Sequence, residues 1–152
     1  MPRDDILKTL DTEFDGLLKT VDGLSDDQMT TVWYGDWGVR DILAHIAGWH
    51  REMTGAFERM ARGERPAPEG VDYSNADPIN ARFAEAGRKT PPAAMLDELK
   101  ASKEAFVAAA RQLPEDRFEE GKTAYRILHT TGIDHYREHM PPIQDWRKRE
   151  SI

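Results

Sequence analysis

Two histidines near the C-terminus stand four residues apart, in the segment His135-Tyr136-Arg137-Glu138-His139. On an α-helix, residues at this spacing lie one turn apart on the same face. Two imidazoles placed in this way can bind one divalent metal ion. The segment differs from the zinc-protease motif, because Tyr136 and not a glutamate follows the first histidine. The same spacing also occurs in ordinary polar helix surfaces, and alone it does not decide between the two.

The other three histidines are His45, His50 and His129. His45 lies at the margin of the apolar stripe of its expected helix, with Asp41 one turn before it and Trp49 one turn after it. A carboxylate at the position of Asp41 could orient the His45 ring toward a metal. His50 and His129 lie nearer the centres of their stripes, so we expect them to pack in the core or across helix contacts. The spacing does not decide whether His45 or His50 is a third ligand.

The composition limits the chemistry further. The chain of 152 residues contains no cysteine, which excludes disulfides, thiolate nucleophiles and cysteine-ligated zinc or iron–sulfur sites. A tight transition-metal site would therefore use histidine with aspartate or glutamate.

The formal net charge of the chain is −7. Because phosphate groups attract a positive surface, this charge predicts no nucleic-acid partner and no membrane partner, although a local basic patch stays open. No segment resembles a signal peptide or a membrane span, so we expect a cytoplasmic protein.

Hydrophobic periodicity predicts an all-α fold. Apolar residues recur at helical spacing in five stretches, at residues 6–24, 37–63, 77–87, 90–113 and from about 123 to 143, with a short capped turn at 25–28. Asp36 and Asp77 are suitable N-caps for the second and third stretches. Pro141-Pro142 falls inside the last stretch and is expected to kink or break it. The pattern predicts one domain over residues 1–152, a four-helix bundle with an additional short helix.

Two segments carry a family resemblance. Residues 37–49 (WGVRDILAHIAGW) resemble the W-[ST]-V-[KR]-[DE]-x-L-A-H-L segment of the DinB-like (DinB/YfiT) superfamily, and residues 135–139 resemble its late H-x-x-x-H segment. The resemblance spans essentially the whole chain and is strongest to the ClbS/DfsB-type four-helix-bundle branch, on the His-Tyr-Arg sequence and the Trp49-His50 pair. Two departures are Gly38, where the pattern has serine or threonine, and Pro141-Pro142 directly after the last histidine.

The resemblance implies a bundle that holds one divalent metal ion, nickel or zinc, between His45, His135 and His139. It implies a metal-dependent enzyme, a transferase or hydrolase that acts on a small electrophilic molecule in stress or detoxification. A low-molecular-weight thiol would be a cofactor, because the chain has no thiol of its own. The alternative is a protein that binds or sequesters a small molecule without turnover, with structural or vestigial histidines. A homodimer is compatible with such a bundle.

A substrate pocket in this bundle should have an apolar, aromatic wall. The residues that could form it are Trp37, Trp49, Met53, Tyr73 and Tyr136, with Asp41 behind a metal ligand. The same residue types at helical spacing equally describe an ordinary core.

Overall fold

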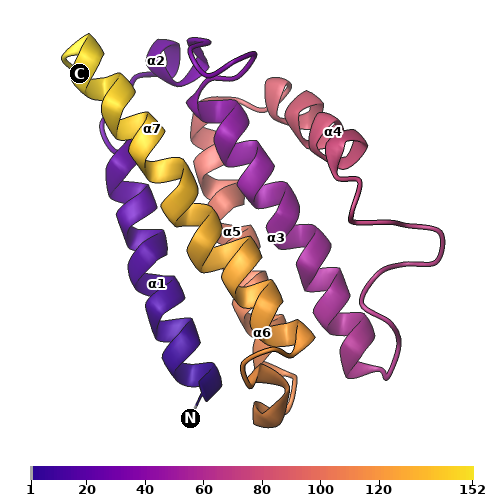
Figure 1. The fold of residues 1–152 in the computed structure, drawn as a ribbon. Coiled ribbons are helices and arrows are strands. Elements are labelled where there is room, and N and C mark those ends of the chain that lie inside the picture. The colour runs from indigo at the N-terminus through magenta and orange to yellow at the C-terminus, as the bar shows by residue number, and fades with distance from the viewer. Residues whose placement is uncertain (1) are drawn as a thin grey trace.

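A computed structural model, which describes residues 2–152, shows a bundle of four long helices (Figure 1). These helices are α1 (Pro2–Val21), α3 (Val39–Ala61), α5 (Pro92–Arg111) and α7 (Asp134–Glu150). The shorter elements are α2 (Asp26–Thr30), α4 (Asp77–Arg88), the 3₁₀ turn η1 (Glu115–Phe118), α6 (Thr123–Ile127) and the π-helical segment η2 (Leu128–Ile133). Residues 2–152 contain no β-strand, only one isolated bridge between Tyr34 and Trp37. The predicted all-α bundle is confirmed.

The apolar stripes of the four long helices meet in one core. Its fully buried side chains come from different helices and include Leu10, Ile42, Phe57, Leu99 and Phe106. Each such side chain stabilises the fold by about 1.5–3 kcal/mol through removal of apolar surface from water. None of the helices in the described chain combines the length and apolarity that a membrane crossing requires.

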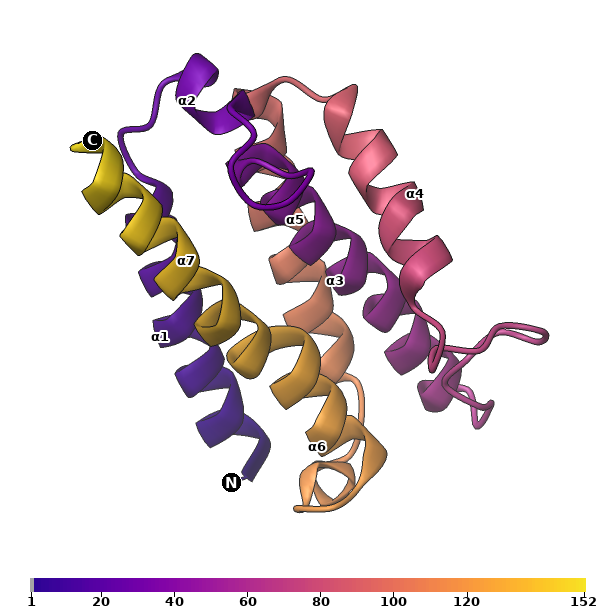
Figure 2. The ribbon, with the colours of Figure 1, turned by 45° about the horizontal axis from the view of Figure 1, so that its top comes forward.

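Helix α4 lies outside the bundle, alongside α3 (Figure 2). Two glycines allow this close approach. A Cβ atom at Gly48 of α3 would lie 2.3 Å from the Phe83 ring of α4, and one at Gly87 would lie 2.4 Å from the Ala44 side chain. Because these two positions have no side chain, α4 can pack closely against α3, with Phe83 beside Trp49.

The start of α3 differs from the predicted one. Asp36 is not the N-cap; it lies in the turn between Tyr34 and Trp37, and Gly38 precedes the first helical residue. The Gly38 N–H donates to the Asp41 carboxylate over 2.8 Å. A Cβ at Gly38 would lie 2.3 Å from the Thr31 carbonyl oxygen, so the chain packs too closely here for serine or threonine.

The predicted break at Pro141-Pro142 is wrong, because α7 continues as one helix through both prolines. Proline lacks an N–H and leaves the carbonyl four residues earlier without its helical partner. Those carbonyls belong to Arg137 and Glu138, which are exposed, so water can serve them. The irregular backbone lies instead in η2, before the histidine pair.

The contact between α3 and α4 gives a stability test. Gly48→Ala should lower the free energy of unfolding by about 1–3 kcal/mol, because the new methyl group overlaps the Phe83 ring. Gly16→Ala on α1 is the matched control: there the nearest atom is the flexible Met140 sulfur at 3.3 Å, so alanine should stabilise the helix by about 0.5–1 kcal/mol. Urea unfolding measures both variants, and equal effects of the two changes would contradict this view of the contact.

Candidate metal centre

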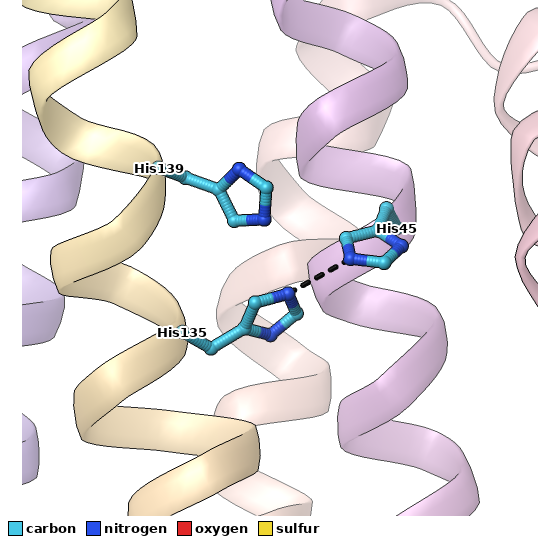
Figure 3. A group of neighbouring side chains, drawn as sticks. All are labelled: His45, His135 and His139. Atoms are coloured by element: carbon cyan, nitrogen blue, oxygen red, sulfur yellow. Dashed lines mark hydrogen bonds between the residues drawn. The ribbon is translucent and has the colours of Figure 1, made fainter. Parts of the chain in front are cut away.

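Three histidines converge between α3 and α7 (Figure 3). His45 comes from α3, while His135 and His139 come from successive turns of α7. One ligand nitrogen from each ring lies within 4.8 Å of the other two. His135 and His139 are buried, and His45 is partly buried. The structure thus brings together the three residues that the resemblance implies.

A hydrogen bond to the backbone determines the tautomer of the His135 ring. The Nδ1 atom of His135 lies 3.2 Å from the Thr131 carbonyl oxygen. A carbonyl only accepts, so Nδ1 carries the proton and, in the neutral ring, Nε2 keeps its lone pair. A backbone carbonyl is a common partner for the second nitrogen of a metal-bound histidine.

The His135 Nε2 lone pair faces the Nε2 atom of His45 over 2.8 Å (Figure 3). A neutral His45 ring with its proton on Nε2 donates to this lone pair, and in the other tautomer two lone pairs face each other, an arrangement that favours a shared cation. The Nδ1 atoms of His45 and His139 are buried and have no hydrogen-bond partner among residues 2–152. One nitrogen from each ring lies close enough to the other two to hold one divalent metal ion.

Burial keeps the three rings neutral. Burial, followed by the nearby His139, lowers the pKa of His45 to about 4. Burial and then the neighbouring His45 and His139 lower the pKa of His135 well below its usual value. Burial also lowers the pKa of His139, with Glu138 acting in the opposite direction. At neutral pH the rings are therefore uncharged, with one nitrogen of each free of a proton, which is the form that can bind a metal.

His50 is part of the core and lies outside this cluster. Its side chain is completely buried, with Nε2 2.5 Å from the Tyr136 hydroxyl and Nδ1 2.8 Å from the Ser102 hydroxyl. The Ser102 hydroxyl donates to the Leu99 carbonyl, so His50 Nδ1–H must donate to Ser102, and the Tyr136 hydroxyl must donate to Nε2. With both nitrogens engaged, His50 has no lone pair for a metal. The expected packing role of His50 agrees with this geometry.

The other sequence-predicted residues divide in the same way. His129 is half-buried against Tyr125, with ring centroids 4.3 Å apart, and does not belong to the cluster. Trp37 packs beside His45 at 5.1 Å between ring centroids. Asp41 is buried and accepts from the Gly38 backbone; no hydrogen bond joins it to His45 in the described chain.

A cavity of about 520 Å³ opens beside the cluster, and His135 forms part of its wall. This volume is in the usual range for small-molecule sites. Trp49, Met53 and Tyr73 line it, as the sequence suggested, whereas Trp37 and Tyr136 do not. Tyr136 instead packs in the core against Phe14 and His50.

Several wall residues were missed by the sequence analysis, among them Arg126, Thr130 and Thr131. Arg126 and His135 are nine residues apart, and on an uninterrupted α-helix they would lie on opposite faces. The π-helical segment η2 between them holds about one extra residue per turn, which changes the phase by roughly 100°. That change brings both residues to one cavity, and no pattern in the sequence predicts it.

The chain matches a sequence family. The match covers residues 10–121 and is to the family described as the mycothiol maleylpyruvate isomerase N-terminal domain. No curated protein matches the chain in sequence.

Solved structures of the same fold include three proteins of low sequence identity. DfsB, described as a sibling lethal factor precursor, superposes with a TM-score of 0.83 at 17% identity, covering 97% of this chain and 96% of DfsB. The colibactin self-resistance protein ClbS superposes with a TM-score of 0.83 at 16% identity, covering 96% of this chain and 95% of ClbS. An uncharacterised protein from Escherichia coli UTI89 superposes with a TM-score of 0.82 at 16% identity, covering 99% of this chain and 95% of that protein. The predicted DinB-like bundle is confirmed.

One prediction from composition is wrong. The net charge led us to exclude a nucleic-acid partner, yet ClbS, with the same fold, is seen in complex with double-stranded DNA. Net charge is a sum over the whole surface and does not describe any one face of it. A value of −7 therefore does not exclude nucleic acid for a bundle of this kind.

The buried contact of His50 gives a test of the core. Tyr136→Phe removes the hydroxyl that donates to His50 Nε2 and leaves a buried acceptor without a partner, which should cost about 1–3 kcal/mol in the free energy of unfolding. Tyr125→Phe is the matched control, because no hydrogen bond joins that hydroxyl to any residue between 2 and 152, and it should change the free energy of unfolding by less than about 0.5 kcal/mol. A Tyr136→Phe protein as stable as the parent in urea would contradict the inferred hydrogen bond.

The lowered pKa values predict how stability depends on pH. Burial lowers the pKa of His45 to about 4 and that of His50 to about 3, below the ordinary histidine value of 6.5. Below pH 6.5 the unfolded chain therefore binds more protons, so the free energy of unfolding falls as the pH falls toward 4. Urea unfolding of metal-free protein between pH 7 and about 5, before most carboxylates titrate, measures this slope. His45→Asn should make the slope shallower, and an unchanged slope would refute the assignment.

Proposed function

The chain belongs to the mycothiol maleylpyruvate isomerase N-terminal domain family of the DinB-like superfamily, and we propose that it is a metal-dependent enzyme. In this proposal His45, His135 and His139 hold one divalent ion, nickel or zinc. The enzyme acts on a small electrophilic molecule by thiol transfer or hydrolysis.

One observation carries the proposal: three neutral imidazoles from two helices bring their nitrogens within 4.8 Å of one another. Neutral imidazole is a preferred ligand of nickel and zinc. Three protein ligands leave coordination positions open, which is typical of catalytic and not of structural sites. The cavity against His135 gives a small molecule access to the same place.

The metal, when bound, would supply Lewis-acid chemistry: polarisation of a carbonyl group, or activation of a water or thiol. The chain's own residues have other parts. The Thr131 carbonyl holds the His135 ring so that Nε2 faces the cluster. Trp49 forms part of the cavity wall. Asp41 fixes the first turn of the helix that carries His45, and Tyr136 holds α7 against α3.

The names of similar proteins favour the same kind of substrate. The family description refers to a reaction of the thiol mycothiol, and ClbS is described as a self-resistance protein. A chain without cysteine needs a thiol from outside for such chemistry. We therefore propose a low-molecular-weight thiol as a cofactor, in a stress or detoxification role.

Metal binding provides the direct test. The purified parent chain should bind one equivalent of nickel or zinc and melt at a higher temperature with the metal than without it. His45→Ala should lose this binding, because only two of the three ligands remain. His129→Ala is the matched control and should keep it, since His129 lies outside the cluster. Elemental analysis and thermal unfolding measure both effects.

Three outcomes would contradict the proposal. A parent chain that binds no metal would remove its basis, and binding that survives His45→Ala would place the metal elsewhere. If metal binds and no thiol is consumed with model electrophiles, and no electrophile is hydrolysed, the protein binds or sequesters its ligand without turnover.

A further inference from the structure

The cavity beside His135 has an unusual charge for this protein. Arg126 is the one side chain in its wall with a fixed charge, and no aspartate or glutamate of residues 2–152 lines it. The chain as a whole carries seven more acidic than basic groups. A cavity with a cationic wall in an acidic protein selects among ligands by charge.

Arg126 forms no ion pair with any carboxylate of the described chain. Its hydrogen bond is a long one, from Nη2 to the Thr123 hydroxyl over 3.3 Å. Glu52 is the acid that touches the wall residue Tyr73, and it is already engaged: one oxygen accepts from the Tyr73 hydroxyl and the other pairs with Arg82. The guanidinium of Arg126 is therefore available to an anion that enters the cavity.

Another part of the cavity wall is aromatic and held in place by hydrogen bonds. Trp49 and Tyr73 meet edge to face, with ring centroids 5.8 Å apart. The Trp49 Nε1–H donates to the Asn80 amide oxygen over 2.7 Å, and the Tyr73 hydroxyl donates to Glu52 over 3.0 Å. Since the polar ends of both rings are engaged, the two rings offer carbon surface to a ligand. Such a surface favours a flat apolar body.

The geometry points to a small carboxylic acid with a flat apolar body as the ligand of this cavity. We propose that its carboxylate pairs with the Arg126 guanidinium, its body lies against Trp49 and Tyr73, and its other end approaches His135. Arg126 and His135 are nine residues apart, which is about two helical turns, so the acid group and the reacting group lie at opposite ends of the molecule. The inference rests on the proposed function only in taking this cavity as the substrate site of the metal centre.

The test compares an acid with its neutral amide. Hydrocinnamate and hydrocinnamamide have the same flat body and differ in charge, and calorimetry on the full chain measures the binding of each. The parent should bind the acid about tenfold more tightly than the amide, the lower end expected for a charge-assisted hydrogen bond. Arg126→Gln should remove this preference, because it should weaken the binding of the acid and leave the binding of the amide unchanged. Arg88→Gln, an equal change of charge at an exposed position of α4, should bind both as the parent does.

Three results would overturn the inference. These are a parent that binds the acid no better than the amide, an Arg126→Gln variant that keeps the preference, and an Arg88→Gln variant that loses it equally. Repeating the titrations with a chelator, which removes bound metal, tests this inference separately from the metal proposal. A charge preference that persists without metal supports the Arg126 assignment even where the His45 test fails, and metal binding without a charge preference refutes the Arg126 assignment alone.

Discussion

The candidate centre depends on one buried chain of hydrogen bonds that joins three helices. The Tyr136 hydroxyl of α7 donates to His50 of α3, and His50 donates to Ser102 of α5, which donates in turn to the Leu99 carbonyl. Each hydrogen bond in this network can run in only one direction. A different rotation of α7 would therefore leave a buried polar atom without a partner. Tyr136 is next to His135, so the bond that joins α7 to α3 also sets where the nitrogens of the histidine cluster lie.

The second constraint is the π-helical segment before α7. It changes the phase of the helix by roughly 100°, and His135 bonds to a carbonyl inside it. Residues of α6 and η2 consequently share a cavity wall with His135. π-Helical turns are frequent at functional sites for this reason, because they present side chains that a regular helix would turn away.

Charge acts locally in this molecule. Burial removes the positive charge from the three histidines and so preserves their lone pairs, while the cavity beside them has a guanidinium in its wall. The overall charge of −7 describes neither the histidine cluster nor the cavity. The same reasoning explains why net charge was a poor guide to nucleic acid, since ClbS carries this fold in a complex with DNA.

The sequence by itself determined the helices, the all-α class and the family, because apolar periodicity and short motifs are local properties of the chain. It also identified His135 and His139 as a pair, since residues four apart on any α-helix share a face. The spacing of the histidines left the choice between His45 and His50 open, because both lie on one helix, and only the family resemblance favoured His45. The sequence also misplaced the start of α3 and missed Arg126. Only the tertiary structure decided these points: the packing of α3 against α5 and α7 buries His50 in the core, and the π turn rotates Arg126 into the cavity. Both depend on contacts between segments far apart in the chain, which local patterns do not contain.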